Sequence, residues 1–163
     1  PIIGNLMAAV LAVLPFFGIL LYYKNFYEVI YFHATFLFLL ILVREMIKDL
    51  ENLKGDLANG YQTIPITYGV NTSKKIITIL LLLTIIPVYY LINVFDVGYM
   101  DIYFYIGFII MLIFGIKLWN SSTRENYLLL HNILKILIVA GVFCIILINP
   151  SVLWNGQRML MRY

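Results

Sequence analysis

The chain has 163 residues, of which 63% are hydrophobic and only 12% charged, and its formal net charge is +3. Soluble domains carry about 25% charged residues, so this composition excludes a water-soluble globular protein. The small positive charge gives no reason to expect a nucleic-acid partner, because basic residues in so apolar a chain set its orientation in a membrane. We therefore expect an integral membrane protein surrounded by membrane lipids.

Runs without charged residues, taken with their flanks, predict five membrane-spanning helices at about 1–23, 26–46, 74–95, 102–119 and 127–149. About 20 apolar residues cross a bilayer, and the backbone must be helical because lipid offers its polar groups no partners. The expected fold is an all-α polytopic transmembrane bundle, with 1–163 in a single membrane domain. Because Pro1 opens directly into an apolar run, we interpret the chain as starting within a longer protein.

Basic residues are divided unequally between the two ends of the predicted bundle. One end has eight and the other has three, so the loop 44–75 at the richer end is expected to face the cytoplasm. The eight are Arg44, Lys48, Lys54, Lys74, Lys75, Lys117, Arg124 and Lys135.

The stretch 44–75 is the one polar segment between apolar runs. Glu45, Asp49, Asn52 and Asp56 follow one another there at spacings of four, three and four residues. At 100° per residue, these positions fall within an arc of roughly 60° on a helix, and Lys48 borders the same face. The helix leaving the membrane is therefore predicted to present a stripe of oxygen ligands beside a cation.

Such a stripe is typical of a magnesium site, because Mg²⁺ is held by one or two carboxylates together with substrate phosphates. The candidate metal ligands are Glu45, Asp49, Asn52 and Asp56. Lys48 and Arg44 are the candidate diphosphate-binding residues, since a cation beside the ligands offsets phosphate charge. The alternative is a solvated helix end whose charges form ordinary pairs, although neighbouring acids on such a face repel one another.

The same segment resembles the second acidic motif of the UbiA superfamily and the loop after it. The residues that carry the resemblance are Arg44-Glu45-x-x-Lys48-Asp49-x-x-Asn52-x-x-Gly55-Asp56, followed by Gly60-x-x-Thr63-x-Pro65 and Gly69. Members of this superfamily are intramembrane prenyltransferases of about nine helices, and the resemblance covers the last five. The Arg-Glu-x-x-Lys-Asp part of this motif is most similar to the motif of members that act on geranylgeranylglyceryl phosphate.

The resemblance implies a Mg²⁺-dependent transfer of a prenyl group from its diphosphate to a lipophilic acceptor. It makes Asp49 and Asp56 the catalytic residues and places Asn5 in the lining of the central cavity. Asn52 departs from the usual Asp of the family, which weakens the expected metal site at that position. The family's first acidic motif is absent from these 163 residues, so the isolated chain is expected to be inactive.

Several alternatives stay open at this point. The acceptor could instead be an aromatic compound of a quinone or haem pathway, and the acidic stripe could serve a cation transporter or belong to a bundle without chemistry. His33, inside the second predicted span, is either a functional group or a neutral side chain bonded to a neighbouring helix, which is the favoured interpretation. Gly60 and Gly69 are expected to allow turns in the loop.

Overall fold

The computed structural model describes residues 2–22, 28–95 and 97–144, which form eight helices and no β-strand. The helices are α1 (Ile2–Tyr22), α2 (Glu28–Glu51), α3 (Leu53–Ala58), α4 (Ile64–Tyr68), α5 (Val70–Leu83), α6 (Ile85–Asn93), α7 (Asp101–Asn120) and α8 (Arg124–Cys144).

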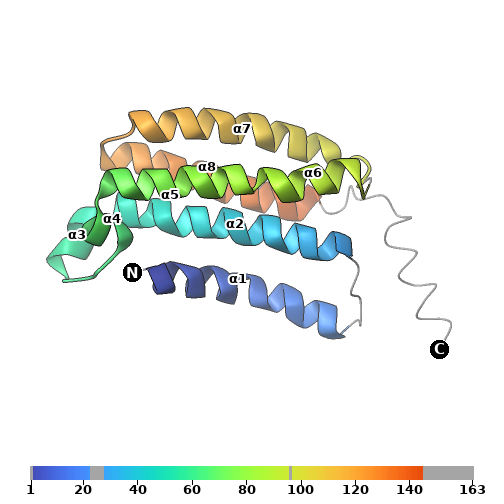
Figure 1. Cartoon of the computed structure of the whole chain (residues 1–163), viewed down its shortest axis with the longest axis horizontal. Coiled ribbons are helices and arrows are strands. Elements are labelled where there is room, and N and C mark those ends of the chain that lie inside the picture. Colours follow the sequence, from blue (N-terminus) through green and yellow to red (C-terminus); the bar gives the residue numbers. More distant parts are fainter. Residues whose placement is uncertain (1, 23–27, 96, 145–163) are drawn as a thin grey trace.

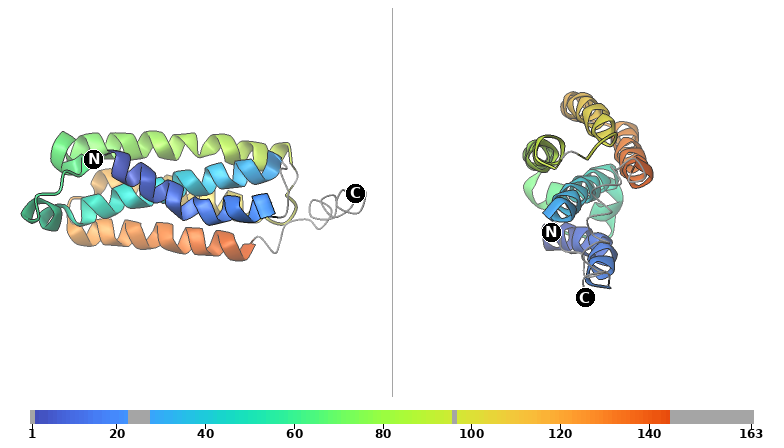
Figure 2. Two further views of the ribbon diagram at one scale, coloured as in Figure 1. Left: turned by 90° about the horizontal axis from the view of Figure 1, so that it is seen from below. Right: turned by 90° about the vertical axis from the view of Figure 1, so that its right-hand side faces the viewer.

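The long helices run side by side along one axis and form an elongated bundle (Figures 1 and 2). Helix α2 is central, because it packs against α1, α5, α6 and α8. The start of α1, the end of α2, the short helices α3 and α4, and the start of α5 all lie at one end of the bundle (Figure 1). The α7–α8 connection lies there too, and we call this the polar end.

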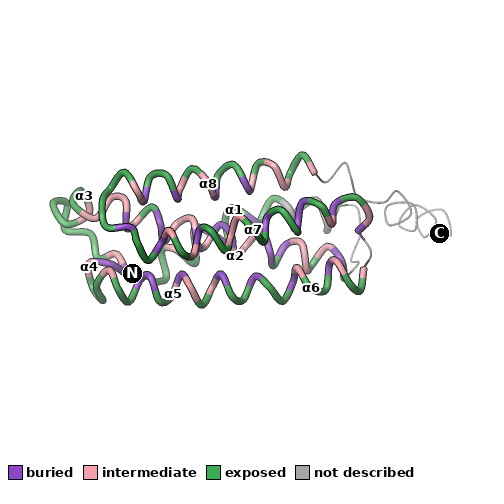
Figure 3. Tube along the Cα trace, turned by 90° about the horizontal axis from the view of Figure 1, so that it is seen from above, coloured by how far each residue is buried: buried purple, intermediate pink, exposed green. Residues whose placement is uncertain are grey.

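Four helical stretches are long and apolar enough to cross a membrane: Glu28–Glu51, Val70–Asn93, Asp101–Asn120 and Arg124–Cys144. Exposed residues recur along these helices (Figure 3), and the apolar ones among them include Ile116 at 68% and Ile136 at 69% exposure. In water such exposure would be unfavourable, whereas lipid accommodates these side chains. The all-α polytopic membrane fold is thereby confirmed.

The number of spans stays a prediction. Helix α1 contributes a shorter apolar stretch, Ile2–Pro15, and the predicted end of the fifth span at 145–149 lies outside the described residues.

Val70–Asn93 is interrupted at Thr84, three residues before Pro87. Proline has no N–H and removes one helical hydrogen bond, so the turn before it must satisfy its carbonyls differently. The Thr84 N–H donates to the carbonyls of both Leu80 and Leu81, at 3.1 and 3.2 Å. Its hydroxyl also donates to the Leu81 carbonyl at 2.6 Å. The interruption of this helix thus falls about one turn before Pro87.

At the polar end, the interruption between α2 and α3 falls at Asn52. Helix α3 runs through Gly55, although glycine inside a helix costs about 1 kcal/mol relative to alanine. The predicted turns at Gly60 and Gly69 are confirmed, since both adopt a positive φ, of 71° and 87°. Such angles are open to glycine and strained for other residues.

Candidate active site

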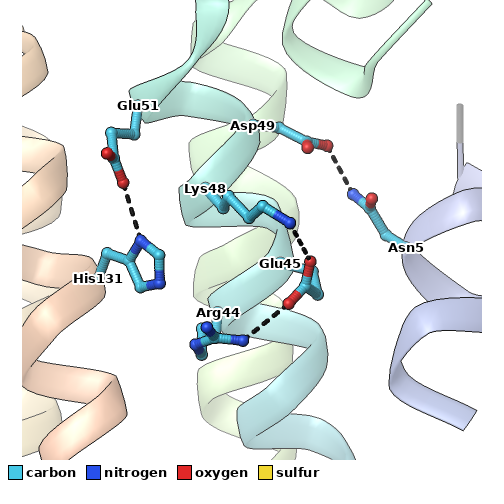
Figure 4. Close-up of polar contacts among 7 residues, drawn as sticks. All are labelled: Asn5, Arg44, Glu45, Lys48, Asp49, Glu51 and His131. Atoms are coloured by element: carbon cyan, nitrogen blue, oxygen red, sulfur yellow. Dashed lines mark hydrogen bonds and ion pairs between the residues drawn. The ribbon is translucent and has the colours of Figure 1, made fainter. Parts of the chain in front are cut away.

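Asp49 lies near the end of α2 on the side that faces α1, and its carboxylate is held in place by Asn5. The Asn5 Nδ2 donates to Asp49 Oδ2 at 2.7 Å across the two helices (Figure 4). Both residues are only partly buried, so the hydrogen bond orients the carboxylate without closing it off. Asn5 thus lies beside the acidic face of α2, while the central-cavity position that the family resemblance implies for it stays a prediction.

Glu45 lies one turn before Asp49 and is flanked by two cations. Arg44 Nη1 lies 2.9 Å from Glu45 Oε1, and Lys48 Nζ lies 3.3 Å from Glu45 Oε2. Figure 4 shows the three side chains converging on one side of α2. Both Glu45 oxygens are therefore committed to the residues predicted to bind diphosphate. Its predicted role as a metal ligand stays open.

Asp56 reaches the same region from α3. Its carboxylate and that of Glu45 are close enough to Asp49 to repel it electrostatically. The Asp56 side chain forms no hydrogen bond or ion pair with another residue in the described part of the chain. Three acids thus share this region with only two cations, and carboxylate oxygens are left over for a further positive charge.

Asn52 occupies a different position from the three acids. It lines a cavity of about 800 Å³ that lies between the α2–α3 junction, the start of α5 and the α7–α8 connection. The Asn52 N–H still donates to the Lys48 carbonyl at 3.0 Å, as it would in a continuous helix. Sequence periodicity placed Asn52 on one stripe with Asp49, but it could not show that α5 and the α7–α8 connection enclose a cavity on this side of Asn52.

The acidic residues suit an open magnesium site rather than a closed one. Among the described residues, no group of three His, Cys, Asp or Glu side chains is arranged to hold a metal ion. Asp49 and Asp56 nevertheless offer the hard oxygen atoms that Mg²⁺ prefers, and this ion commonly takes its other ligands from phosphate and water. The donor chemistry therefore fits Mg²⁺, with part of the coordination supplied from elsewhere.

Sequence reasoning missed a second polar pair at this end. Glu51 points to the opposite side of α2 from Asp49 (Figure 4). Its Oε2 lies 2.8 Å from Nδ1 of His131 in α8, at hydrogen-bond distance. The two residues are 80 positions apart, and the sequence carries no local signal that joins them. This contact links α2 to α8 inside the bundle.

His33 does not form the bond to a neighbouring helix that the sequence favoured. Its Nδ1 bonds to the Val29 carbonyl in its own helix at 2.8 Å, and its buried Nε2 has no hydrogen-bond partner among the described residues. The ring packs against Phe104 of α7, with 5.9 Å between centroids. The expectation of a hydrogen bond between helices is therefore wrong.

With the geometry in place, comparison with known proteins identifies the family. The pattern of the UbiA prenyltransferase family matches residues 1–132, which include α1 to α7 and the acidic face. The chain belongs to the UbiA prenyltransferase family.

Similar sequences include digeranylgeranylglyceryl phosphate synthases from three archaea. The one from Methanosphaera stadtmanae is 36% identical over 61% of the chain and 37% of the relative. The one from Saccharolobus solfataricus is 30% identical over 88% of the chain and 51% of the relative, and the one from Methanobrevibacter smithii is 29% identical over 76% and 45%. The chain thus spans about half or less of these relatives, and no solved structure matches it.

Membership of the UbiA family confirms the resemblance drawn from the motif around Asp49 and Asp56. It gives no support to the cation-transporter alternative, which rested on the acidic stripe alone. Membership of the family does not by itself decide the roles of individual side chains, which depend on their contacts.

Proposed function

We propose that the full-length protein is a Mg²⁺-dependent intramembrane prenyltransferase. It would move a prenyl group from a prenyl diphosphate to a lipophilic acceptor. The acceptor we propose is geranylgeranylglyceryl phosphate, and the names of the similar archaeal synthases support that choice. The observation that carries the proposal is the group of Glu45, Asp49 and Asp56 beside Arg44 and Lys48, at the end of an apolar bundle.

In this proposal, Asp49 and Asp56 would hold the metal and the neighbouring cations would hold phosphate. The metal would supply positive charge beside the leaving diphosphate. Arg44 and Lys48 keep 29% and 49% of their side chains exposed, so both can reach phosphate oxygens while Glu45 orients them. Asn5 fixes the direction of the Asp49 carboxylate through its 2.7 Å hydrogen bond.

The proposed reaction breaks the bond between the allylic carbon and the diphosphate oxygen. Diphosphate leaves with the bonding electron pair, and the allylic carbocation is attacked by the acceptor hydroxyl, which then loses its proton. Charge develops on the diphosphate as the bond breaks, so cations aimed at that point lower the barrier. The apolar bundle beside the site limits access of water, which would otherwise capture the carbocation.

We also propose that the polar end faces the cytoplasm. The eight basic residues counted in the sequence belong to helices whose ends meet there, including Lys48 of α2, Lys74 of α5 and Arg124 of α8. An excess of Lys and Arg marks the cytoplasmic side of membrane proteins. Soluble prenyl diphosphate and Mg²⁺ would then reach the acids from the cytoplasm.

The test uses the full-length protein in detergent, with candidate prenyl diphosphates and with geranylgeranylglyceryl phosphate or aromatic acceptors. We expect prenylated geranylgeranylglyceryl phosphate to form only when Mg²⁺ is present. Asp56→Ala should remove this activity, whereas Glu125→Ala, an exposed acid in the first turn of α8, should not. If transfer occurred only to aromatic acceptors, the proposed acceptor would be wrong and the protein would belong to another branch of the family. Full activity of Asp56→Ala would contradict the metal role.

A further inference from the structure

A second polar site lies on the other side of α2 from Asp49. It is the cavity of about 800 Å³ described above, which we call the polar-end cavity. The polar residues in its lining come from three places: the α2–α3 junction, the start of α5 and the α7–α8 connection. They are Glu51, Asn52, Lys54, Asn71, Lys74, Ser121, Ser122, Thr123, Arg124 and Tyr127.

Basic side chains dominate the charge of this lining. Lys54 and Arg124 are exposed, and neither forms an ion pair with another described residue. They come from α3 and α8, so the fold brings together two cations that are 70 positions apart in the chain. Two like charges facing one space repel each other, and an anion between them removes that repulsion.

The lining offers little negative charge to oppose them. Glu51 is its only carboxylate among the described residues, and this side chain is 11% exposed and directed at His131, 2.8 Å away. Neutral donors complete the surface, among them the amide of Asn71 and the hydroxyl of Ser122. A lining of this kind matches an anion with several oxygens, because charge-assisted bonds to such oxygens are short and strong.

Lys74 holds one side of the cavity in place through hydrogen bonds. Its side chain is 6% exposed, and its Nζ donates to the Ser121 carbonyl at 2.6 Å and to the Trp119 carbonyl at 3.4 Å. Tyr127 also donates to the Ser121 carbonyl, at 3.1 Å. These bonds tie α5 to the α7–α8 connection, so the cavity keeps its shape without a ligand.

We propose that the polar-end cavity binds a phosphate group, carried either by free phosphate or by the headgroup of an anionic lipid. The site is separate from the candidate active site, since Asp49 faces α1 whereas the cavity faces α5 and α8. It does not depend on the proposed transferase activity. Both sources share one chemistry, and the cavity lies where the bundle passes from apolar helices to polar segments.

The first experiment titrates inorganic phosphate into the full-length protein in neutral detergent and follows binding by calorimetry. Lys54→Gln and Arg124→Gln should each weaken binding about two- to fivefold, the range expected when one exposed charge is lost. Lys75→Gln is the matched control, because Lys75 is exposed on the same helix as Lys74 and does not line the cavity.

The second experiment distinguishes the lipid source. The same variants are placed in nanodiscs of phosphatidylcholine, with or without phosphatidylglycerol, and retained lipid is measured by native mass spectrometry. Retention of phosphatidylglycerol that falls with Lys54→Gln and Arg124→Gln supports a headgroup site even if free phosphate does not bind. Thermal unfolding of each variant checks the fold, and either variant alone suffices if the other is unstable.

The proposal is overturned if neither probe binds the unsubstituted protein. It is also overturned if Lys75→Gln weakens binding as much as Arg124→Gln, since that would indicate general attraction of anions to a basic end.

Discussion

On the α1 side of helix α2, the Asp49 carboxylate accepts a hydrogen bond from Asn5. The carboxylates of Glu45 and Asp56 repel it electrostatically. On the α8 side, two residues further on, Glu51 is paired with His131. The Glu51 pair is largely shielded, with exposures of 11% and 19%. The α1 side instead has more carboxylates than cations, and a carboxylate can accept about four hydrogen bonds or metal contacts in all.

One end of α2 thus has two roles. An acid that is already paired between packed helices contributes to the stability of the bundle, because its hydrogen bond joins two helices in the folded state. Acids that repel one another are unfavourable until a positive charge joins them. We therefore expect substitutions on the α8 side to change stability and substitutions on the α1 side to change ligand binding and turnover.

The largest expected effect is on the α1 side. Asp49→Asn keeps the shape of the side chain and removes its charge, so it should lower the turnover of the full-length protein at least about 100-fold. Loss of an outer partner of a metal ligand already costs about 10- to 100-fold. The apparent melting temperature should stay unchanged. Steady-state transfer assays at saturating Mg²⁺ check this, and normal turnover would remove Asp49 from the site.

The second-largest expected effect concerns the packing of α8 against α7. A Cβ at Gly141 would lie 2.6 Å from the Tyr103 hydroxyl oxygen, which donates to the Leu137 carbonyl at 3.0 Å. Gly141→Ala should therefore destabilise the bundle by about 1–3 kcal/mol, as overpacking does. The measurement is unfolding in detergent.

Gly115→Ala is the matched control, because nothing lies within 4 Å of its added Cβ. It should be neutral or slightly stabilising, since alanine is the better helix former. Equal destabilisation by both variants would show that the α7–α8 contact is not tight.

A smaller effect is expected from Asn5, which acts through Asp49. Asn5→Leu should raise the Mg²⁺ concentration needed for half-maximal activity about tenfold, while the rate at saturating Mg²⁺ stays near normal. A merely structural role would change stability instead. Asn93→Leu is the control, because among the described residues that amide bonds only to the Tyr89 carbonyl in its own helix. An unchanged Mg²⁺ requirement would exclude a positioning role for Asn5.

The smallest effect tests the α8 side directly. Glu51→Gln should lower the free energy of unfolding by about 1 kcal/mol, the size of one weakened hydrogen bond to a charged group. Transfer activity should be retained, since Glu51 faces away from Asp49. Thermal unfolding and a transfer assay on the same preparation measure both. A large loss of activity with normal stability would reverse the assignment of the two sides.

The sequence was sufficient for the helical bundle, because membrane helices are encoded by apolar runs that need no long-range information. The acidic residues could be found for a similar reason, since Glu45 and Asp49 lie on one uninterrupted helix. Asn52 could not be placed, because the cavity that it lines is completed by α5 and the α7–α8 connection, which are distant from it in the sequence.

Contacts between distant segments were beyond the sequence. Glu51 meets His131, and Lys74 reaches the Ser121 carbonyl 47 positions away, only because α2, α5 and α8 pack together. His33 shows the same limit, since its expected partner on another helix is replaced by a carbonyl of its own helix. Local patterns identify polar residues, while packing decides which of them meet.

The most direct test of the account asks which side of α2 binds the metal. Mn²⁺ can replace Mg²⁺ as a paramagnetic probe, and its binding to the full-length protein with a prenyl diphosphate can be followed by electron paramagnetic resonance. A bound Mn²⁺ signal is expected for the unsubstituted protein and for Glu51→Gln, and this signal should be lost in Asp49→Asn. Bound Mn²⁺ retained in Asp49→Asn but lost in Glu51→Gln would contradict metal binding on the α1 side.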